Sequence, residues 1–166
     1  MRSSVLVTAK VEFPHPGSQA NGARVDAESV VEQPDPVVLI VDDDPVICDV
    51  LTVILEDEGL EAHAVYRGED ALEWAKDHSP QAIILDLMMP GIDGWETCRR
   101  LKDDPRTTRI PVIVLTARVT ERDRNLSLWA GAESFFTKPV ETENLVGAVK
   151  RTIESTVKPP PPRPDR

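Results

Sequence analysis

The side chains best suited to chemistry in this 166-residue chain are a run of three acids, a single acid, a hydroxyl and an amine. Each directly follows a short stretch typical of a strand. Asp42, Asp43 and Asp44 follow residues 37–41, Asp86 follows 82–85, Thr116 follows 112–115 and Lys138 follows 134–137. Chance placement of such groups at four strand-like ends is improbable, whereas a single pocket would explain all of them.

Carboxylates that face one cavity repel one another, so they need a cation or shared protons in order to coexist. Mg²⁺ prefers one or two carboxylates together with water and a phosphoryl oxygen. An ammonium at Lys138 and a hydroxyl at Thr116 would complete a cavity complementary to a tetrahedral dianion. The pattern therefore predicts a phosphoryl site.

Asp86 is the predicted nucleophile of this site, because a carboxylate is already ionised at neutral pH and needs no general base. Catalysis would consist of in-line positioning and charge neutralisation by Mg²⁺ and Lys138. The product would be an aspartyl phosphate. For a lone aspartate the competing interpretation is a helix cap or a turn residue, and the rest of the pattern argues against it.

The elements that must position these groups are strands and helices in alternation. Continuous apolar runs at 37–41, 82–85 and 112–115 are typical of strands buried on both faces. Residues 60–65 predict a more polar edge strand, and 134–137 a short one. Helices are predicted at about 45–58, 68–77, 94–102, 120–130 and 142–155. Strand–helix alternation predicts an α/β fold with a parallel sheet and right-handed crossovers, so the strands' carboxyl ends meet at one edge.

The first predicted helix has clear end signals. Asp44 offers a side-chain acceptor at the N-cap, Pro45 suits the first turn, and Gly59 closes the helix. Its apolar residues recur at three and four positions and predict one stripe against the sheet. That predicted stripe consists of Ile47, Val50, Leu51, Ile54 and Leu55.

The segment from Val37 to Glu154 resembles the receiver domain of two-component response regulators. Four motifs carry the resemblance: Ile40-Val-Asp-Asp-Asp-Pro45, Ile84-Leu-Asp-Leu-Met-Met-Pro-Gly-Ile-Asp-Gly94, Val114-Leu-Thr-Ala117 and Ala130-Gly-Ala-Glu-Ser-Phe-Phe-Thr-Lys-Pro139. Each motif alone is weak, but four in the right order over one domain length are specific. The resemblance implies a flavodoxin-like, doubly wound (βα)5 fold with strand order 2-1-3-4-5.

The resemblance also implies roles for individual residues. Asp86 would take its phosphoryl group from a phosphohistidine on a sensor histidine kinase or a histidine phosphotransfer protein. Mg²⁺ would be held by Asp42, Asp43, Asp86 and the backbone carbonyl of Met88. Thr116 and Lys138 would bind the phosphoryl oxygens, with a cis peptide between Lys138 and Pro139. Thr116 and Phe135 would act as a switch that changes binding to other proteins, although Phe135 lacks the hydroxyl of the commoner tyrosine.

Two other functions fit parts of the pattern. Asp42-Asp43-Asp44-Pro45-Val46 also matches the motif of haloacid-dehalogenase-type phosphatases, with Asp42 as nucleophile and Asp44 as general acid. That interpretation leaves Asp86 without a role, and no clear cap domain exists. A receiver-like scaffold that takes no phosphate is the third option, and the complete set of pocket residues argues against it.

Composition narrows the class further. A formal charge of −10 argues against nucleic-acid binding. No apolar run approaches the roughly 20 residues of a membrane span, and the two cysteines, Cys48 and Cys98, suit a reducing compartment. We therefore expect a cytoplasmic signalling module with no membrane partner, whose only catalysis is its own phosphorylation and dephosphorylation.

The predicted organisation is a flexible arm over residues 1–36, a receiver domain over 37–155 and a proline-rich tail over 156–166. Too few residues follow Glu154 for an output domain, so a complete chain would be a stand-alone receiver that acts by binding another protein or by passing phosphate on in a relay. In a fragment the tail would be a linker. Trp129, just before the end of the fourth helix, is a candidate contact for a partner because aromatic residues anchor such contacts.

Overall fold

The computed structural model describes residues 34–117, 120, 125 and 130–157. From Asp35 onward the described residues belong to one compact unit, whose five strands form a single parallel sheet. The strands are β1 (Val37–Val41), β2 (Glu61–Val65), β3 (Ala82–Leu85), β4 (Val112–Thr116) and β5 (Ser134–Thr137). Their order across the sheet is β2-β1-β3-β4-β5, which confirms the flavodoxin-like arrangement.

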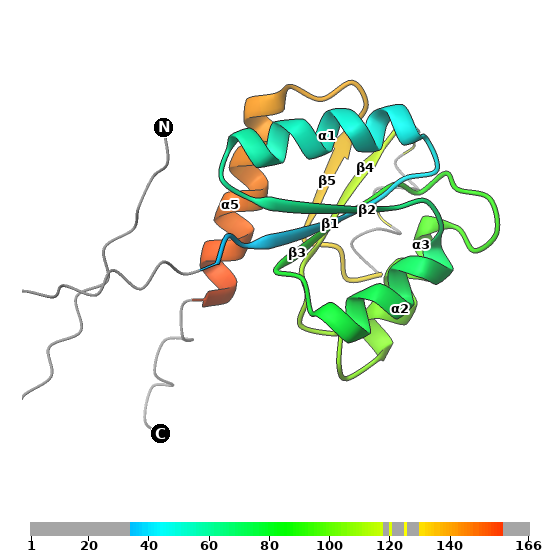
Figure 1. Ribbon diagram of the computed structural model, residues 1–166. Coiled ribbons are helices and arrows are strands. Elements are labelled where there is room, and N and C mark those ends of the chain that lie inside the picture. Colours follow the sequence, from blue (N-terminus) through cyan, green and yellow to red (C-terminus); the bar gives the residue numbers. More distant parts are fainter. Residues whose placement is uncertain (1–33, 118–119, 121–124, 126–129, 158–166) are drawn as a thin grey trace, which may run out of the picture. The chain divides into compact units, whose positions relative to one another are not determined.

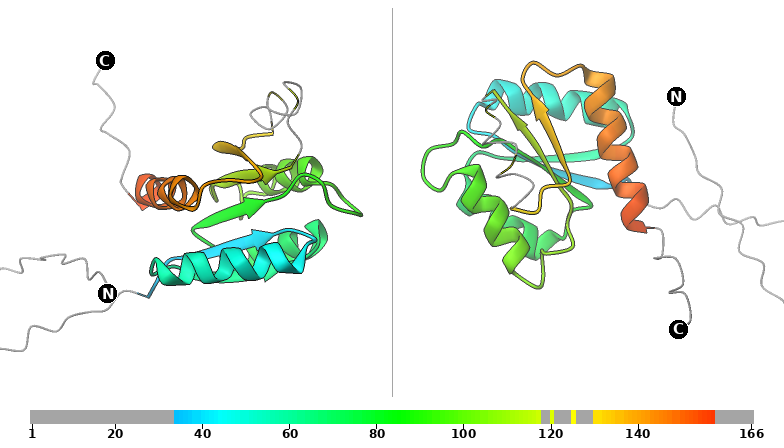
Figure 2. Two further views of the ribbon diagram at one scale, coloured as in Figure 1. Left: turned by 90° about the horizontal axis from the view of Figure 1, so that it is seen from above. Right: turned by 180° about the vertical axis from the view of Figure 1, so that it is seen from behind.

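Helices cover both faces of the sheet (Figures 1 and 2). Those described are α1 (Pro45–Asp57), α2 (Gly68–His78), α3 (Gly94–Asp103) and α5 (Thr142–Val157). α1 and α5 pack on one face and α2 and α3 on the other, so each face has its own hydrophobic core. The helix predicted over 120–130 falls mainly on residues outside the described part, as does Trp129.

The central strands are buried on both faces, as their continuous apolar sequences predict. Successive residues of β1 alternate between the two cores: Leu39 lies in the core beside α2 and α3, whereas Ile40 lies in the core beside α1 and α5. Burying one such side chain contributes about 1.5–3 kcal/mol. β2 is an edge strand whose first four residues are exposed or half-buried, which agrees with its more polar sequence.

Local signals set the ends of α1 as predicted. The Asp44 carboxylate accepts a hydrogen bond from the Val46 N–H at 2.9 Å, and Pro45 occupies the first helical position. Gly59 has a φ of +78°, a backbone conformation that favours glycine. The predicted inward stripe was wrong at Val50, which is 53% exposed. Cys48 takes the inward place because it lies one helical turn before the inward-facing Leu51.

The two cysteines are buried and are not joined by a disulfide. Most of the predicted arm and most of the predicted tail lie outside the described residues, so both stay predictions. Within the part of the chain that the structure describes, no helix has the length and apolar character that a membrane crossing requires.

Candidate functional site

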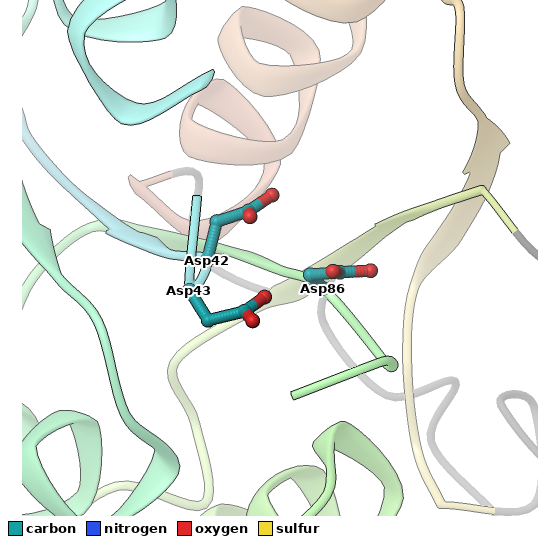
Figure 3. A group of neighbouring side chains, drawn as sticks. All are labelled: Asp42, Asp43 and Asp86. Carbon is teal, nitrogen blue, oxygen red and sulfur yellow. The ribbon is translucent and has the colours of Figure 1, made fainter. Parts of the chain in front are cut away.

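The three acids predicted to bind a metal lie together at the carboxyl ends of two neighbouring strands (Figure 3). Asp42 and Asp43 follow β1, and Asp86 follows β3, which pairs directly with β1. The chain then leaves the two strands in opposite directions, because α1 packs on one face and α3 on the other. Open α/β sheets bind their ligands in the crevice that such a divergence creates.

The carboxylates are close enough to share one cation. Oxygens of Asp42, Asp43 and Asp86 all lie within 4.8 Å of one another. Asp42 and Asp86 are buried, with 3% and 6% of their surface exposed, whereas Asp43 is exposed. An all-oxygen set that is partly open to solvent suits a hard divalent ion that keeps some of its water.

Asp86 has one oxygen whose surroundings point to a missing partner. Its Oδ1 is buried and accepts no hydrogen bond from the residues that the structure describes. Leaving a buried acceptor unpaired is costly, and a divalent cation between the three acids would provide the missing interaction. The residues present therefore fit Mg²⁺, on the chemistry of the donor set and on this unpaired oxygen.

Lys138 brings a positive charge to the same place from the far end of the sequence. Its Nζ donates a hydrogen bond to Oδ2 of Asp42 and lies 3.5 Å from Oδ2 of Asp86. The Lys138 backbone N–H donates to the Thr116 carbonyl at 2.9 Å, which ties the residue to the end of β4. The Lys138–Pro139 peptide bond is cis, as predicted.

Burial raises the pKa of Asp42 above its ordinary value of 3.8, and the nearby charge of Asp86 adds to this effect. Hydrogen bonds from the Lys138 ammonium and from the Asp44 N–H act in the opposite direction. The net direction is upward because removing a carboxylate from water disfavours its charged form more than these contacts favour it. Proton and metal ion therefore compete for Asp42.

Gly94 fixes the peptide that carries the Asp86 carbonyl. A Cβ built at Gly94 would lie 2.2 Å from Asp86 O and 2.6 Å from Leu87 Cα, so no larger residue fits without moving the backbone. The Gly94 N–H donates to the Leu87 carbonyl at 3.1 Å. α3 begins at this glycine, with Asp93 as its N-cap. The start of α3 is thus packed directly against the phosphoacceptor candidate.

The predicted switch residues lie on one face of the sheet. Thr116 is fully buried at the end of β4, the strand beside β3. Phe135 pairs with Val114 across β4 and β5 and packs on the core beside α2 and α3. Because residues two apart on a strand share a face, Thr116 and Phe135 are diagonal neighbours on that face. Met88, two residues after Asp86, is 50% exposed.

A family model described as "response regulator receiver domain" matches residues 38–150, and the site just described falls within that range. The chain belongs to this family. Receiver domains are the signalling modules of two-component systems, so the resemblance found in the sequence is confirmed.

Solved receiver domains of several organisms are similar to this one. The receiver domain of a signal transduction histidine kinase from Syntrophus aciditrophicus is 37% identical, with a TM-score of 0.70 over 75% of this chain and 95% of that chain. A CheY-like receiver domain protein from Methanospirillum hungatei is 25% identical, with a TM-score of 0.70 over 74% and 96%.

A third similar structure bears on the metal. It is the receiver domain of a sensor histidine kinase from Pseudomonas aeruginosa, 29% identical, with a TM-score of 0.68 over 72% of this chain and 98% of that chain. That protein has a magnesium ion coordinated in its active-site cleft. In the present chain the cluster of Asp42, Asp43 and Asp86 lies at the carboxyl edge of the sheet.

The structure also bears on the phosphatase alternative. In the phosphatase interpretation the general acid would be Asp44. In the structure, however, the Asp44 carboxylate accepts a hydrogen bond from the Val46 N–H and so caps α1. Asp86, which that alternative leaves unused, lies buried beside Asp42 and Lys138. Together with the family membership, these contacts leave the phosphatase interpretation without support.

Two features of the site carried no signal in the sequence. One is the ion pair between Lys138 and Asp42, which are 96 residues apart. The other is Glu69, at the start of α2, whose Oε1 accepts a hydrogen bond from the Ile92 N–H at 3.4 Å. Acids in the first turn of a helix are common, so Glu69 was not distinguishable from its neighbour Asp70.

Proposed function

We propose that this receiver domain accepts a phosphoryl group on Asp86 from a phosphohistidine of a sensor histidine kinase or a histidine phosphotransfer protein. The observation that carries the proposal is a buried carboxylate with one unpaired oxygen, placed beside two further acids and an ammonium. Asp86 would bond to phosphorus as the phosphorus–nitrogen bond of the donor breaks. The electron pair of that bond stays on the imidazole nitrogen.

The residues around Asp86 have separate tasks in this proposal. Asp42, Asp43, Asp86 and the Met88 carbonyl would hold Mg²⁺, which when bound neutralises negative charge on the phosphoryl oxygens. The Lys138 ammonium is placed to neutralise a further oxygen, and the Thr116 hydroxyl to donate to another. Since Lys138 already pairs with Asp42, it would exchange part of this contact for the phosphoryl group.

The exposed apolar residues support a protein as the donor. Val46 is 67% exposed, Tyr66 46% and Met88 50%. Tyr66 directly follows β2. Val46 lies two residues after Asp44, and Met88 lies two residues after Asp86. Val50 and Val53, also more than half exposed, lie four and seven residues after Val46 and so share its face of α1. Apolar side chains around a charged centre are typical of a protein–protein contact.

Phosphorylation would act on partners through Thr116 and Phe135. A phosphoryl group on Asp86 would draw the Thr116 hydroxyl toward it, and the Phe135 ring would then move into the vacated space. Their position as diagonal neighbours on one face of the sheet supports this coupling. Without a phenol oxygen, Phe135 would transmit the change by packing alone. Trp129 stays a candidate partner contact.

Intact-mass measurement tests the acceptor directly. The protein is incubated with acetyl phosphate and Mg²⁺, and one added phosphoryl group is expected on the natural sequence and none on Asp86→Asn. Asp93→Asn is the matched control, because it changes a carboxylate on the same loop while leaving an N-cap acceptor in place. Phosphate that survives in Asp86→Asn would overturn the proposal, and loss only in Asp42→Asn would favour the phosphatase alternative.

A further inference from the structure

Glu69 links α2 to the loop that follows the phosphoacceptor strand. Its Oε1 accepts a hydrogen bond from the Ile92 N–H at 3.4 Å, across 23 residues of sequence. Gly91, the residue before Ile92, lies directly beneath the carboxylate: a Cβ there would be 3.2 Å from Oε1 and 3.5 Å from Oε2. Gly91 also has a φ of +85°, which disfavours any side chain. The carboxylate is therefore seated on the Gly91–Ile92 peptide.

The neighbouring Gly68 brings Glu69 to this position. A Cβ at Gly68 would lie 2.2 Å from Thr97 Oγ1 and 2.7 Å from Ile92 Cγ1. Only glycine lets the first turn of α2 approach α3 and Ile92 so closely. The contact between Glu69 and the loop thus depends on a close backbone approach as well as on one hydrogen bond.

The same loop is fixed at its other end against Asp86. Gly94 packs on the Asp86 carbonyl and donates its N–H to the Leu87 carbonyl. Between these two fixed points lies Met88, whose carbonyl is a proposed ligand of Mg²⁺. A loop held at both ends presents that carbonyl in one place, which lowers the cost of ordering it when the ion binds.

We propose that Glu69 is a positioning residue that holds the loop between β3 and α3, and with it the Met88 carbonyl, in the place that Mg²⁺ binding requires. The inference rests on the proposed function of the site. Glu69 makes no contact with the ion in this account. It acts only through the Ile92 N–H and the peptide beneath its carboxylate.

A simpler role for Glu69 must be separated from this one. Acids in the first turn stabilise a helix through its dipole, and both Glu69 and Asp70 are in the first turn of α2. Asp70 is exposed, and its replacement by Asn removes the same charge from the same turn. Glu69→Gln removes the charge of Glu69 but keeps an oxygen that can accept from Ile92. Asp70→Asn and Glu69→Gln therefore distinguish the effect of a lost charge at the start of α2 from the effect of a lost hydrogen bond to the loop.

The experiment measures two quantities in the full chain: the amide hydrogen exchange of Ile92 without metal, and the affinity for Mg²⁺. For Glu69→Ala we expect faster exchange at Ile92 and an Mg²⁺ affinity that falls by about two- to tenfold, the worth of one hydrogen bond. Glu69→Gln and Asp70→Asn are expected to stay near the natural protein in both quantities. Should Glu69→Ala not fold, Glu69→Asp keeps the charge in the first turn of α2 but has a side chain one methylene too short for the Ile92 N–H, and the same two changes are expected.

Several results would overturn the inference. They are an unchanged Mg²⁺ affinity in Glu69→Ala, an equal effect of Asp70→Asn, or a Glu69→Gln variant that behaves like Glu69→Ala. If Glu69→Ala does not fold, unchanged values in Glu69→Asp would overturn it. The outcome is distinguishable from failure of the proposed function, because Asp86 phosphorylation in the natural protein is measured separately and Ile92 exchange needs no phosphate.

Discussion

Replacing Gly94 with Ala is the sharpest test of how the fold positions Asp86, the proposed phosphoacceptor. The added Cβ would lie 2.2 Å from Asp86 O, 2.6 Å from Leu87 Cα and 2.9 Å from Asp86 C. Non-bonded carbon contacts are normally about 3.5–4.0 Å. The nearest overlap therefore exceeds about 1 Å, and it falls on backbone atoms that have no rotamer with which to move away.

The expected cost follows from this overlap. Overpacking costs about 1–3 kcal/mol, and contact with backbone atoms places this case toward the upper end. Alanine gains at most about 1 kcal/mol over glycine in a helix, and less at the first position, where Gly94 lies. We expect a net loss of about 2 kcal/mol in the free energy of unfolding, which corresponds to a fall in Tm of roughly 5–15 °C.

Gly147→Ala is the matched control, because it makes the same substitution in α5. The nearest atom to a Cβ at Gly147 is Arg151 Nη1 at 3.0 Å, the end of a flexible and exposed side chain. This variant should gain about 0.5–1 kcal/mol. Gly94→Ala and Gly147→Ala are thus expected to change the free energy of unfolding in opposite directions.

Urea denaturation measures both changes, and acetyl-phosphate labelling followed by intact mass reports the effect on the site. Relief of the Gly94 overlap must displace the Asp86 peptide or the start of α3, so slower labelling should accompany the loss of stability. A Gly94→Ala variant that is as stable as the natural protein and is labelled as fast would refute the packing argument.

Four further predictions concern the acids and the thiols. Burial raises the pKa of Asp42, so on acidification this carboxylate should take up a proton at a higher pH than an ordinary aspartate does. Mg²⁺ affinity should weaken over the same higher pH range, and measurements of Mg²⁺ binding from pH 7.5 to 5 test this. Without Mg²⁺, the folded state binds the proton of Asp42 more tightly than the unfolded state does. The contribution of Asp42 to the free energy of unfolding should therefore fall as the pH rises from 3.8 through the raised pKa. Burial raises the pKa of both Cys48 and Cys98 to about 11. Both thiols should therefore react slowly with iodoacetamide at pH 7.5 in the native protein and quickly only after unfolding. Fast reaction of the native protein would contradict their burial. Asp93→Ala should cost about 1 kcal/mol in urea denaturation, because the Asp93 carboxylate accepts the Glu96 N–H at 2.9 Å, while Asp93→Asn should cost little.

The sequence by itself determined the strands, the helix ends and the edge at which the site forms. These depend on short-range signals: apolar runs for the central strands, Asp44 and Pro45 at the start of α1, and Gly59 at its end. Parallel strands place their carboxyl ends at one edge. That Asp42, Asp86 and Lys138 lie at one edge therefore followed from their places after strands, whereas the ion pair between Lys138 and Asp42 did not.

Only the tertiary structure decided how α1 is rotated against the sheet. Apolar residues occupy more than one side of this helix, so its sequence is compatible with more than one inward face. In the structure Cys48 is buried against the sheet and Val50 is exposed. The same holds for the close approach of Gly94 to Asp86 and of Glu69 to Ile92. Such contacts join residues whose separation in space depends on how whole elements pack, and no local pattern of residues encodes that distance.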